Sequence, residues 1–295
     1  MTQAQHYDAV VIGAGQGGVP LARALAQAGR KTALVEREHV GGTCINEGCT
    51  PTKTMVASAK VAYMDRRSDD YGVQNGSITL DMLRVRQRKR DLVESFRSGS
   101  ERHIEATEGL DLLMGEASFT GLKDLEVQLN NGETLWLSAD DIFINVGAQP
   151  SSPPIEGLDS VPTLDSTSIM ELDEVPDHLL VLGGGYVGVE FAQMFRRFGS
   201  EVTVVQRGPQ LLSREDSDVA EAVADILRED GIEVLLGTEA QRAEKSDGEI
   251  HLAVRTSDGE RVLGERTSLR QQAASPTQTC CTCPRAASRR TGAAS

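Results

Sequence analysis

The chain has 295 residues, and its 44 acidic and 30 basic side chains give a formal net charge of −14 at pH 7. This acidic balance argues against a nucleic acid or an anionic membrane as partner. No apolar stretch reaches the roughly 18 residues that cross a bilayer, and the first residues lack the pattern of a secretory signal, so we expect a soluble cytoplasmic protein of about two domains.

The first element has the pattern of a dinucleotide-binding unit. The apolar run 10–12 leads into the glycine loop 13–18, a helical pattern follows, and a second strand ends at Glu36. Glycines at these positions let the backbone approach a pyrophosphate at a helix N-terminus, and an acid about 20 residues on binds the ribose hydroxyls. The predicted contacts of the dinucleotide are therefore Gly13, Gly15, Gly18 and Glu36.

The stretch 41–53 holds two cysteines, Cys44 and Cys49, with four residues between them. Pro51 opens a run with helical periodicity, which predicts that Cys49 lies at a helix N-terminus, where the helix dipole and backbone N–H groups favour a thiolate. We interpret the pair as a redox-active disulfide. A structural disulfide is less consistent with a cytoplasmic protein, and a zinc half-site needs a second ligand pair that is missing, so no metal site is predicted.

The following region predicts one further helix, from about 81 to 107, and then a series of strands. A basic cluster at 84–90 is interpreted as the solvated face of that helix. Strands are expected at 112–119, 126–129 and 134–137, and a buried parallel strand at 141–146 rejoins the first sheet. Proline and serine residues from 151 onward mark a domain boundary.

A second unit repeats the first. A strand ending at Leu182 leads into the glycine loop 183–188, and the spacing from Gly183 to Gln206 equals that from Gly13 to Glu36. Gln206 has no charge with which to repel a 2′-phosphate and Arg207 attracts one, so NADPH is favoured over NADH. The predicted fold is α/β, with two tandem Rossmann-like dinucleotide-binding domains at 1–150 and 151–267, the second one incomplete.

Together these motifs resemble those of class I pyridine nucleotide-disulfide oxidoreductases, the family that contains dihydrolipoamide dehydrogenase, glutathione reductase and mercuric reductase. The resemblance covers residues 6–264 and rests on the loop 13–18 with Glu36, the stretch 41–53 and the segments 144–148 and 183–190. The sequence Cys-Thr-Pro-Thr-Lys that starts at Cys49 is most similar to that of mercuric reductase-like members.

The resemblance implies an electron path from NADPH or NADH to FAD, then through Cys49, which faces the flavin, to Cys44, which meets a small-molecule disulfide, dithiol or metal-ion substrate. It also implies that Lys53 pairs with Glu190 near the flavin and that Tyr186 gates the nicotinamide pocket; from the residues alone, Glu190 also fits an ordinary helix-surface glutamate and Tyr186 a packed loop tyrosine. The implied FAD contacts further include Gly42, Thr43, Lys53, Gly115, Ala117, Asn145 and Gly147. The implied nicotinamide-nucleotide contacts are Gly183, Gly185, Tyr186, Gly188, Gln206 and Arg207.

The repeat is predicted to fail near the end of the second unit. Strands are expected at 249–254 and 261–263, but residues 268–295 contain no acidic residue and no valine, isoleucine or aromatic. We expect no returning strand there, and we expect a disordered, out-of-frame-like tail and the absence of the dimerisation domain through which the resembled family forms homodimers. Two alternatives to an active reductase follow: a non-catalytic truncated remnant, and a thiol metal-binding protein that uses the tail cysteines.

Overall fold

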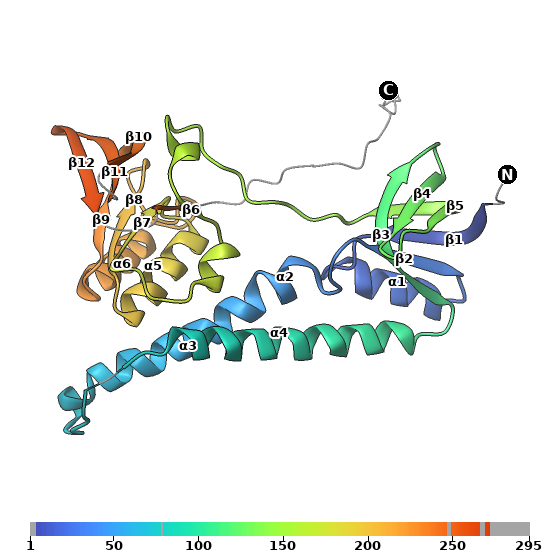
Figure 1. Cartoon of the computed structure of the whole chain (residues 1–295), viewed down its shortest axis with the longest axis horizontal. Helices are drawn as coiled ribbons and strands as arrows, with labels where there is room; N and C mark the ends of the chain where they lie inside the picture. Colours follow the sequence, from blue (N-terminus) through green and yellow to red (C-terminus); the bar gives the residue numbers. More distant parts are fainter. Residues whose placement is uncertain (1–3, 78, 247–248, 266–268, 272–295) are drawn as a thin grey trace, which may run out of the picture. The chain divides into compact units, whose positions relative to one another are not determined.

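The computed structural model describes residues 4–77, 79–246, 249–265 and 269–271 (Figure 1). These residues form two compact units, of which the first contains residues up to 46 and 94–148, and the second contains 47–93 and the described residues from 149 to 271. One boundary between the units therefore falls between Cys44 and Cys49. The predicted tail beyond Gln271 lies outside the described residues.

The first unit is an α/β fold in which five strands close into a ring. Strands β5, β1, β2 and β3 run parallel, and β4 pairs antiparallel with both β3 and β5. The strands are β1 (Gln5–Ile12), β2 (Thr32–Glu36), β3 (Leu110–Phe119), β4 (Asp124–Leu129) and β5 (Thr134–Ile144). The helices α1 (Gly18–Gln27) and α2 (Gly42–Asn46) belong to this unit.

Two apolar cores lie on opposite sides of the parallel strands. On β1, Val10 and Ile12 face the core inside the ring, whereas Val11 faces the core beneath α1. Successive residues of a strand point to opposite faces, so a run that is apolar at every position forms a strand that is buried on both sides. On α1, Ala22 and Ala26 are buried one turn apart, and their small side chains let the helix lie close to the sheet.

Strand β5 corrects one detail of the sequence prediction. The segments 134–137 and 141–146, predicted as two strands, are joined in one continuous strand that ends at Ile144. Its first residues pair with β4, and the residues from Leu137 to Ile144 pair with β1. Because the pairing with β1 begins where the pairing with β4 ends, the backbone between the two segments stays hydrogen-bonded in the sheet.

The second unit has a parallel sheet with the strand order β6-β13-β7-β8-β9 and an antiparallel sheet with the order β10-β11-β12. Its strands are β6 (Thr163–Leu164), β7 (His178–Leu182), β8 (Glu201–Val205), β9 (Glu233–Leu235), β10 (Glu239–Ser246), β11 (Glu249–Thr256), β12 (Gly259–Glu265) and β13 (Leu269–Gln271). Its helices are α3 (Cys49–Arg66), η1 (Ser68–Tyr71), the first part of α4 (Met82–Glu105), η2 (Leu158–Ser160), η3 (Ser168–Glu171), α5 (Tyr186–Phe198) and α6 (Ser217–Glu229).

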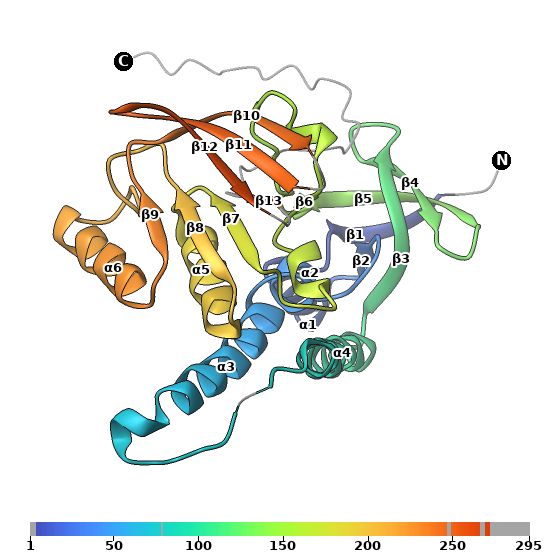
Figure 2. The ribbon, with the colours of Figure 1, turned by 60° about the vertical axis from the view of Figure 1, so that its left-hand side comes forward.

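The parallel sheet of this unit lies between its helices and the antiparallel sheet (Figure 2), and it separates two cores. Leu179 and Val181 of β7 pack with apolar side chains of α3, α5 and α6. Leu180 and Leu182 point to the opposite face and pack with apolar side chains of β11 and β12. The alternation along β7 therefore defines three layers: helices, parallel sheet and antiparallel sheet.

The expectation that this sheet lacks a returning strand is wrong. Leu269–Gln271 forms β13, which runs parallel to both β6 and β7 and lies between them. A strand of three residues is held by backbone hydrogen bonds, so a prediction based on the absence of valine, isoleucine and aromatic residues could not detect it. Among the helices of the described residues, none is both long and apolar enough to span a bilayer.

Candidate functional site

The first glycine loop connects β1 to α1 and leaves no space for side chains. Gly13 has a φ of +100°, a conformation that residues with a Cβ rarely adopt. A Cβ on Gly18 would lie 1.9 Å from the carbonyl oxygen of Gly13. The first turn of the helix therefore starts directly against the end of the strand, which leaves its N–H groups available to an anion.

Glu36 ends β2 beside this loop. Its Oε2 accepts a hydrogen bond from the backbone N–H of Ala14 at 2.8 Å, and its Oε1 accepts one from the N–H of Glu38 at 2.9 Å. The carboxylate is thus held at the carboxyl ends of the parallel strands. This is the position from which an acid binds ribose hydroxyls in a dinucleotide fold.

Asn145 and Gly42 pack directly on the loop. The Nδ2 of Asn145 donates to the Gly13 carbonyl at 3.2 Å. Gly42 has a φ of +59°, and a Cβ there would lie 2.6 Å from the Cα of Gly15. Six of the residues predicted from the sequence as FAD contacts therefore gather at one loop: Gly13, Gly15, Gly18, Glu36, Gly42 and Asn145.

The remaining residues predicted on this side are more dispersed. Gly115 follows Met114, the residue of β3 that pairs with Glu36, so its backbone lies at the same end of the sheet. Ala117 is buried in the core inside the ring. Thr43 lies in α2, and Gly147 adopts a φ of +73° in the segment after β5.

The second glycine loop repeats this geometry between β7 and α5. Gly183 has a φ of +103°, and a Cβ on Gly188 would lie 2.1 Å from the carbonyl oxygen of Gly183. The backbone N–H of Gly184 donates to Oε1 of Gln206 at 2.9 Å, as Ala14 does to Glu36 in the first loop. Gly185 precedes α5 as its N-cap, and Arg207 is exposed beside Gln206.

Cys49 is the first residue of α3, as the position of Pro51 predicts, and Gly48 precedes it as the N-cap. Cys49 is exposed, and Cys44 is half-buried in α2. The hydroxyl of Thr52 donates to the Gly48 carbonyl at 2.6 Å, which fixes the turn where the helix begins. Anions are stabilised at such an N-terminus because its first N–H groups have no partner within the helix.

One cavity of the second unit brings together three of the predicted site residues. The ammonium group of Lys53 on α3 forms an ion pair with the carboxylate of Glu190 on α5. Both side chains line a cavity of about 410 Å³, together with Tyr186 at the start of α5. Its walls are otherwise mostly apolar, with Val56, Val189, Met194 and Leu212 among them.

Sequence reasoning missed Glu215, whose carboxylate accepts a hydrogen bond from the hydroxyl of Tyr186. This bond raises the pKa of Tyr186 above its ordinary value of 10.0, because the phenol can lose its proton only by placing a second negative charge beside Glu215. Glu215 lies in the irregular segment between β8 and α6, where no sequence periodicity indicates which side chains meet.

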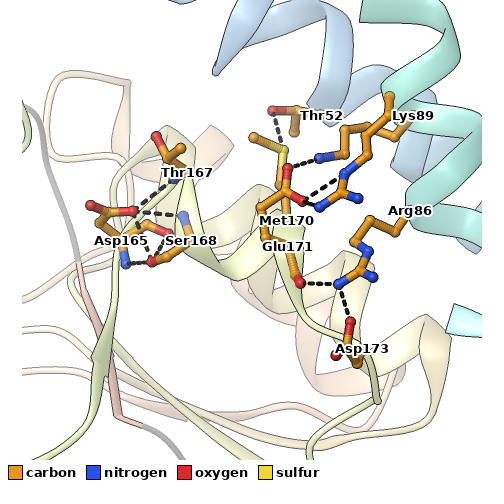
Figure 3. A network of polar contacts seen from close by, with 10 residues as sticks. Thr52, Arg86, Lys89, Asp165, Thr167, Ser168, Met170, Glu171 and Asp173 are labelled. Carbon is orange, nitrogen blue, oxygen red and sulfur yellow. Dashed lines mark hydrogen bonds and ion pairs between the residues drawn. The ribbon is translucent and has the colours of Figure 1, made fainter. Parts of the chain in front are cut away.

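A second set of contacts that was missed lies around η3 and reaches the first turn of the helix bearing Cys49 (Figure 3). The hydroxyl of Thr52 lies 3.7 Å from the sulfur of Met170 on η3. The next residue, Glu171, accepts hydrogen bonds from Lys89 and Arg90 of α4, with the Arg90 Nε at 3.0 Å from its Oε2. These contacts link α4 to η3, and η3 to the first turn of α3.

Burial and hydrogen bonding shift the pKa in opposite directions both at Lys89 and at Glu171. Only 4% of the Lys89 side chain is exposed, and this burial lowers its pKa despite the bond to Glu171. Burial alone would raise the pKa of Glu171, but the hydrogen bonds from Lys89 and Arg90 outweigh it and hold that pKa below the ordinary value. The expectation that the basic cluster 84–90 is a solvated face is therefore wrong for Lys89.

In the described part of the chain, His6, Asp8 and Asp140 place atoms of the kind that bind metals within 4.8 Å of one another. These side chains lie near the amino end of β1, far along the strand from the glycine loop at its carboxyl end. The ammonium group of Lys31 binds the His6 carbonyl at 3.0 Å, and this positive charge disfavours a second cation nearby.

Comparison with known proteins identifies the family. Residues 7–268 match the sequence model of the pyridine nucleotide-disulphide oxidoreductases. The Escherichia coli protein named Probable pyridine nucleotide-disulfide oxidoreductase RclA is 38% identical over 249 residues, which cover 83% of this chain and 52% of the relative. Mercuric reductase of Streptomyces lividans is 40% identical over 259 residues, which cover 87% of this chain and 54% of the relative.

The solved structures agree with this result. The Cu(II) complex of the HOCl-induced flavoprotein disulfide reductase RclA from Escherichia coli matches with a TM-score of 0.79 and 35% identity, over 93% of this chain and 58% of that chain. The chain therefore belongs to the pyridine nucleotide-disulfide oxidoreductase family, which confirms the resemblance and the α/β fold class predicted from the sequence. It spans about half the length of the curated relatives that it matches.

Proposed function

We propose that this chain carries the two nucleotide sites and the dithiol of a flavin-dependent NAD(P)H oxidoreductase that reduces a disulfide or a thiol-reactive metal ion. The observation that supports this proposal most strongly is the repeat of one phosphate-binding loop on two sheets. In each loop a backbone N–H is held by a side chain at the end of the next strand, Glu36 in the first and Gln206 in the second.

The first loop fits the pyrophosphate of FAD. The contacts at Gly18 and Gly42 exclude side chains from the loop, and the N-terminal N–H groups of α1 favour an anion. Glu36 is in place for the ribose hydroxyls, because a carboxylate that accepts hydrogen bonds from Ala14 and Glu38 can accept further ones. When bound there, FAD supplies two-electron redox chemistry between the nicotinamide and the cysteines.

The second loop is the proposed site of the nicotinamide nucleotide. Its N–H groups at the start of α5 bind the pyrophosphate, and the amide of Gln206 accommodates a 2′-phosphate that a carboxylate would repel. The exposed guanidinium of Arg207 attracts the same phosphate. We therefore propose NADPH as the preferred reductant, with NADH as the alternative.

The cysteines carry the electrons to the substrate. A hydride brings two electrons, and reducing the disulfide between Cys44 and Cys49 uses these two electrons and two protons to form two thiols. The N-terminus of α3 favours the thiolate of Cys49, and Lys53, held by Glu190, adds a positive charge four residues along the same helix. Cys44 is then the thiol that attacks the substrate.

The names of the relatives favour particular substrates. One relative is called a mercuric reductase and the solved structure is a Cu(II) complex of a disulfide reductase, so a soft metal ion that binds thiolates is a candidate beside a small disulfide. A cytoplasmic location stays a prediction from the composition, and the homodimer implied by the resemblance is a property of the family that is not proposed for this chain.

Binding of FAD and the roles of the thiols test the proposal together. The purified chain should bind one FAD, and NADPH should reduce that flavin in the absence of oxygen. The variant Cys44→Ser should keep a long-wavelength absorbance band from the contact between thiolate and flavin, and Cys49→Ser should lose it. A band that persists only in Cys49→Ser would reverse the roles of the two thiols, and a chain that binds no FAD would refute the proposal.

A further inference from the structure

The segment that follows β8 is attached to the second glycine loop. The backbone N–H of Leu212 donates to the carbonyl oxygen of Gly184 at 2.8 Å. Leu212 has a φ of +45°, and among the described residues it is the one non-glycine with a positive φ. Such a conformation persists only where its surroundings fix it, and here the buried side chain of Leu212 packs in the core beneath α5.

A series of hydrogen bonds continues from this attachment to Glu215. Gln206, whose Oε1 binds the glycine loop, uses its Nε2 to donate to the Gln210 carbonyl at 3.1 Å. The Nε2 of Gln210 donates to the Glu215 carbonyl at 3.1 Å. The backbone N–H of Glu215 donates to the carbonyl of Leu212 at 2.8 Å. Both backbone polar groups of Glu215 are therefore engaged, which fixes where its side chain starts.

The side chain of Glu215 then determines where Tyr186 lies. Tyr186 is 57% exposed, so packing alone does not fix its ring, and its hydroxyl donates to the Glu215 carboxylate. The same ring forms part of the wall of the cavity that contains the ion pair of Lys53 and Glu190. A hydrogen bond to an ionised acceptor is roughly twice as strong as a neutral one, so it can hold an exposed ring at that wall.

We propose that Glu215 is the positioning residue for Tyr186, and that it sets the affinity for the nicotinamide end of the nucleotide by keeping the tyrosine ring at the wall of this cavity. The inference rests on the proposed function, because it takes the cavity beside Lys53 and Glu190 as the nicotinamide site. Under this inference, nicotinamide binding depends on Glu215, a residue outside the glycine loop. Without Glu215 the ring moves freely, and binding must then order it.

The variant Glu215→Gln removes the charge and keeps the size of the side chain, and Glu221→Gln on α6 is the matched control. The first measurement is the pKa of Tyr186, obtained by NMR of ring-labelled tyrosine and assigned with Tyr186→Phe. In Glu215→Gln this pKa should fall toward its ordinary value, and in Glu221→Gln it should not change. An unchanged pKa in Glu215→Gln would show that the carboxylate does not hold the phenol and would overturn the proposal.

The second measurement compares two ligands that differ in the nicotinamide. For NADPH, Glu215→Gln should raise the Kd about 2- to 10-fold, the range expected when binding must order one additional side chain. For 2′,5′-ADP, which has no nicotinamide, the Kd should stay the same. Equal weakening of both ligands would mean that Glu215 only supports the loop, and an unchanged Kd for NADPH would mean that the tyrosine position does not govern binding; either result overturns the inference.

Failure of the proposed function gives a different pattern. If the unmodified chain binds neither NADPH nor 2′,5′-ADP, the assignment of the nucleotide site is wrong, and the role of Glu215 in nicotinamide binding is overturned with it. The contact between Tyr186 and Glu215 is still decided by the NMR titration. The variant Tyr186→Phe removes the same hydrogen bond from the other side, so it should weaken NADPH binding as Glu215→Gln does, and the double variant should bind no more weakly than either one.

Discussion

Replacement of Glu171 by glutamine should loosen the attachment of η3 to α4. Glu171 accepts hydrogen bonds from Lys89 and Arg90, and its backbone carbonyl accepts one from Arg86 at 2.7 Å (Figure 3). Glutamine has nearly the same size and keeps one oxygen as an acceptor, so the variant removes the charge and leaves the packing intact. Lys89 then remains almost fully buried with only a neutral partner.

The stability lost in Glu171→Gln can be estimated from the exposure of the side chains of Glu171, Lys89 and Arg90. A hydrogen bond to a charged group contributes about 1.5–3 kcal/mol and a neutral one about 0.5–1.5 kcal/mol. The Arg90 contact is half exposed and contributes about 0–1 kcal/mol. Removing one partner of a fully buried ion pair costs about 3–5 kcal/mol, but the Glu171 side chain is 40% exposed. We therefore expect a loss of about 2 kcal/mol, or about a 30-fold increase in local opening.

Hydrogen exchange measured by mass spectrometry is the appropriate assay, because a chain with two compact units need not unfold in one step. Amides of η3 and of the first turns of α4 should exchange about 30-fold faster in Glu171→Gln than in the unmodified protein. Glu174→Gln removes the same charge from an exposed position three residues further on and should leave exchange unchanged. Equal protection in all three proteins would refute the argument that burial of Lys89 makes its partner necessary.

The difference in hydrogen-exchange protection between the unmodified protein and Glu171→Gln should depend on pH, and the direction of this dependence follows from the pKa of Glu171. Because the pKa of Glu171 in the folded chain lies below its ordinary value of 4.5, its ionised form stabilises the fold above pH 4.5. That stabilisation is lost as the pH falls through the lowered pKa. The difference in protection between the unmodified protein and Glu171→Gln should therefore be full at pH 7 and shrink below pH 4.5. A difference that grows as the pH falls would contradict this assignment.

Two further predictions concern the nucleotide sites. A Cβ on Gly18 or on Gly188 would collide with a backbone oxygen. We therefore expect Gly18→Ala to abolish FAD binding and keep NADPH binding, and Gly188→Ala to abolish NADPH binding and keep FAD binding. Calorimetric titration with each ligand checks this, and loss of both ligands in either variant would show that the units do not act separately. Gln206→Glu should shift the preference from NADPH toward NADH, measured as the ratio of the two Kd values, because an acid repels a 2′-phosphate; an unchanged ratio would assign the selectivity to Arg207.

The glycine loops were predictable because their requirements are local. Gly13 and Gly183 must have positive φ values, and Gly18 and Gly188 must approach the preceding strand end more closely than any side chain permits. Each requirement concerns residues within six positions of one another. A single sequence is therefore sufficient to place the two loops, the strands before them and the helices after them.

Contacts between distant segments were not predictable in this way. Glu171 and Lys89 are 82 positions apart, and Tyr186 and Glu215 are 29 apart. Nothing in the local pattern of either partner indicates the other, since an acid in a short helix or an irregular segment has the same local sequence pattern whether it faces solvent or a buried ammonium. The pair of Lys53 and Glu190 is 137 positions apart, and it was found only because a family resemblance supplied it.

The two loops also show which part of the repeat serves the fold and which part selects the ligand. Glu36 and Gln206 each accept a hydrogen bond from the second residue of the glycine loop, at 2.8 and 2.9 Å. A carboxylate oxygen and an amide oxygen meet this structural requirement equally well, so the fold does not specify the charge at that position. The charge affects only what is bound, because it acts on ribose hydroxyls or on a 2′-phosphate outside the loop. Selectivity can therefore change at this position without disturbing the sheet on which the loop is built.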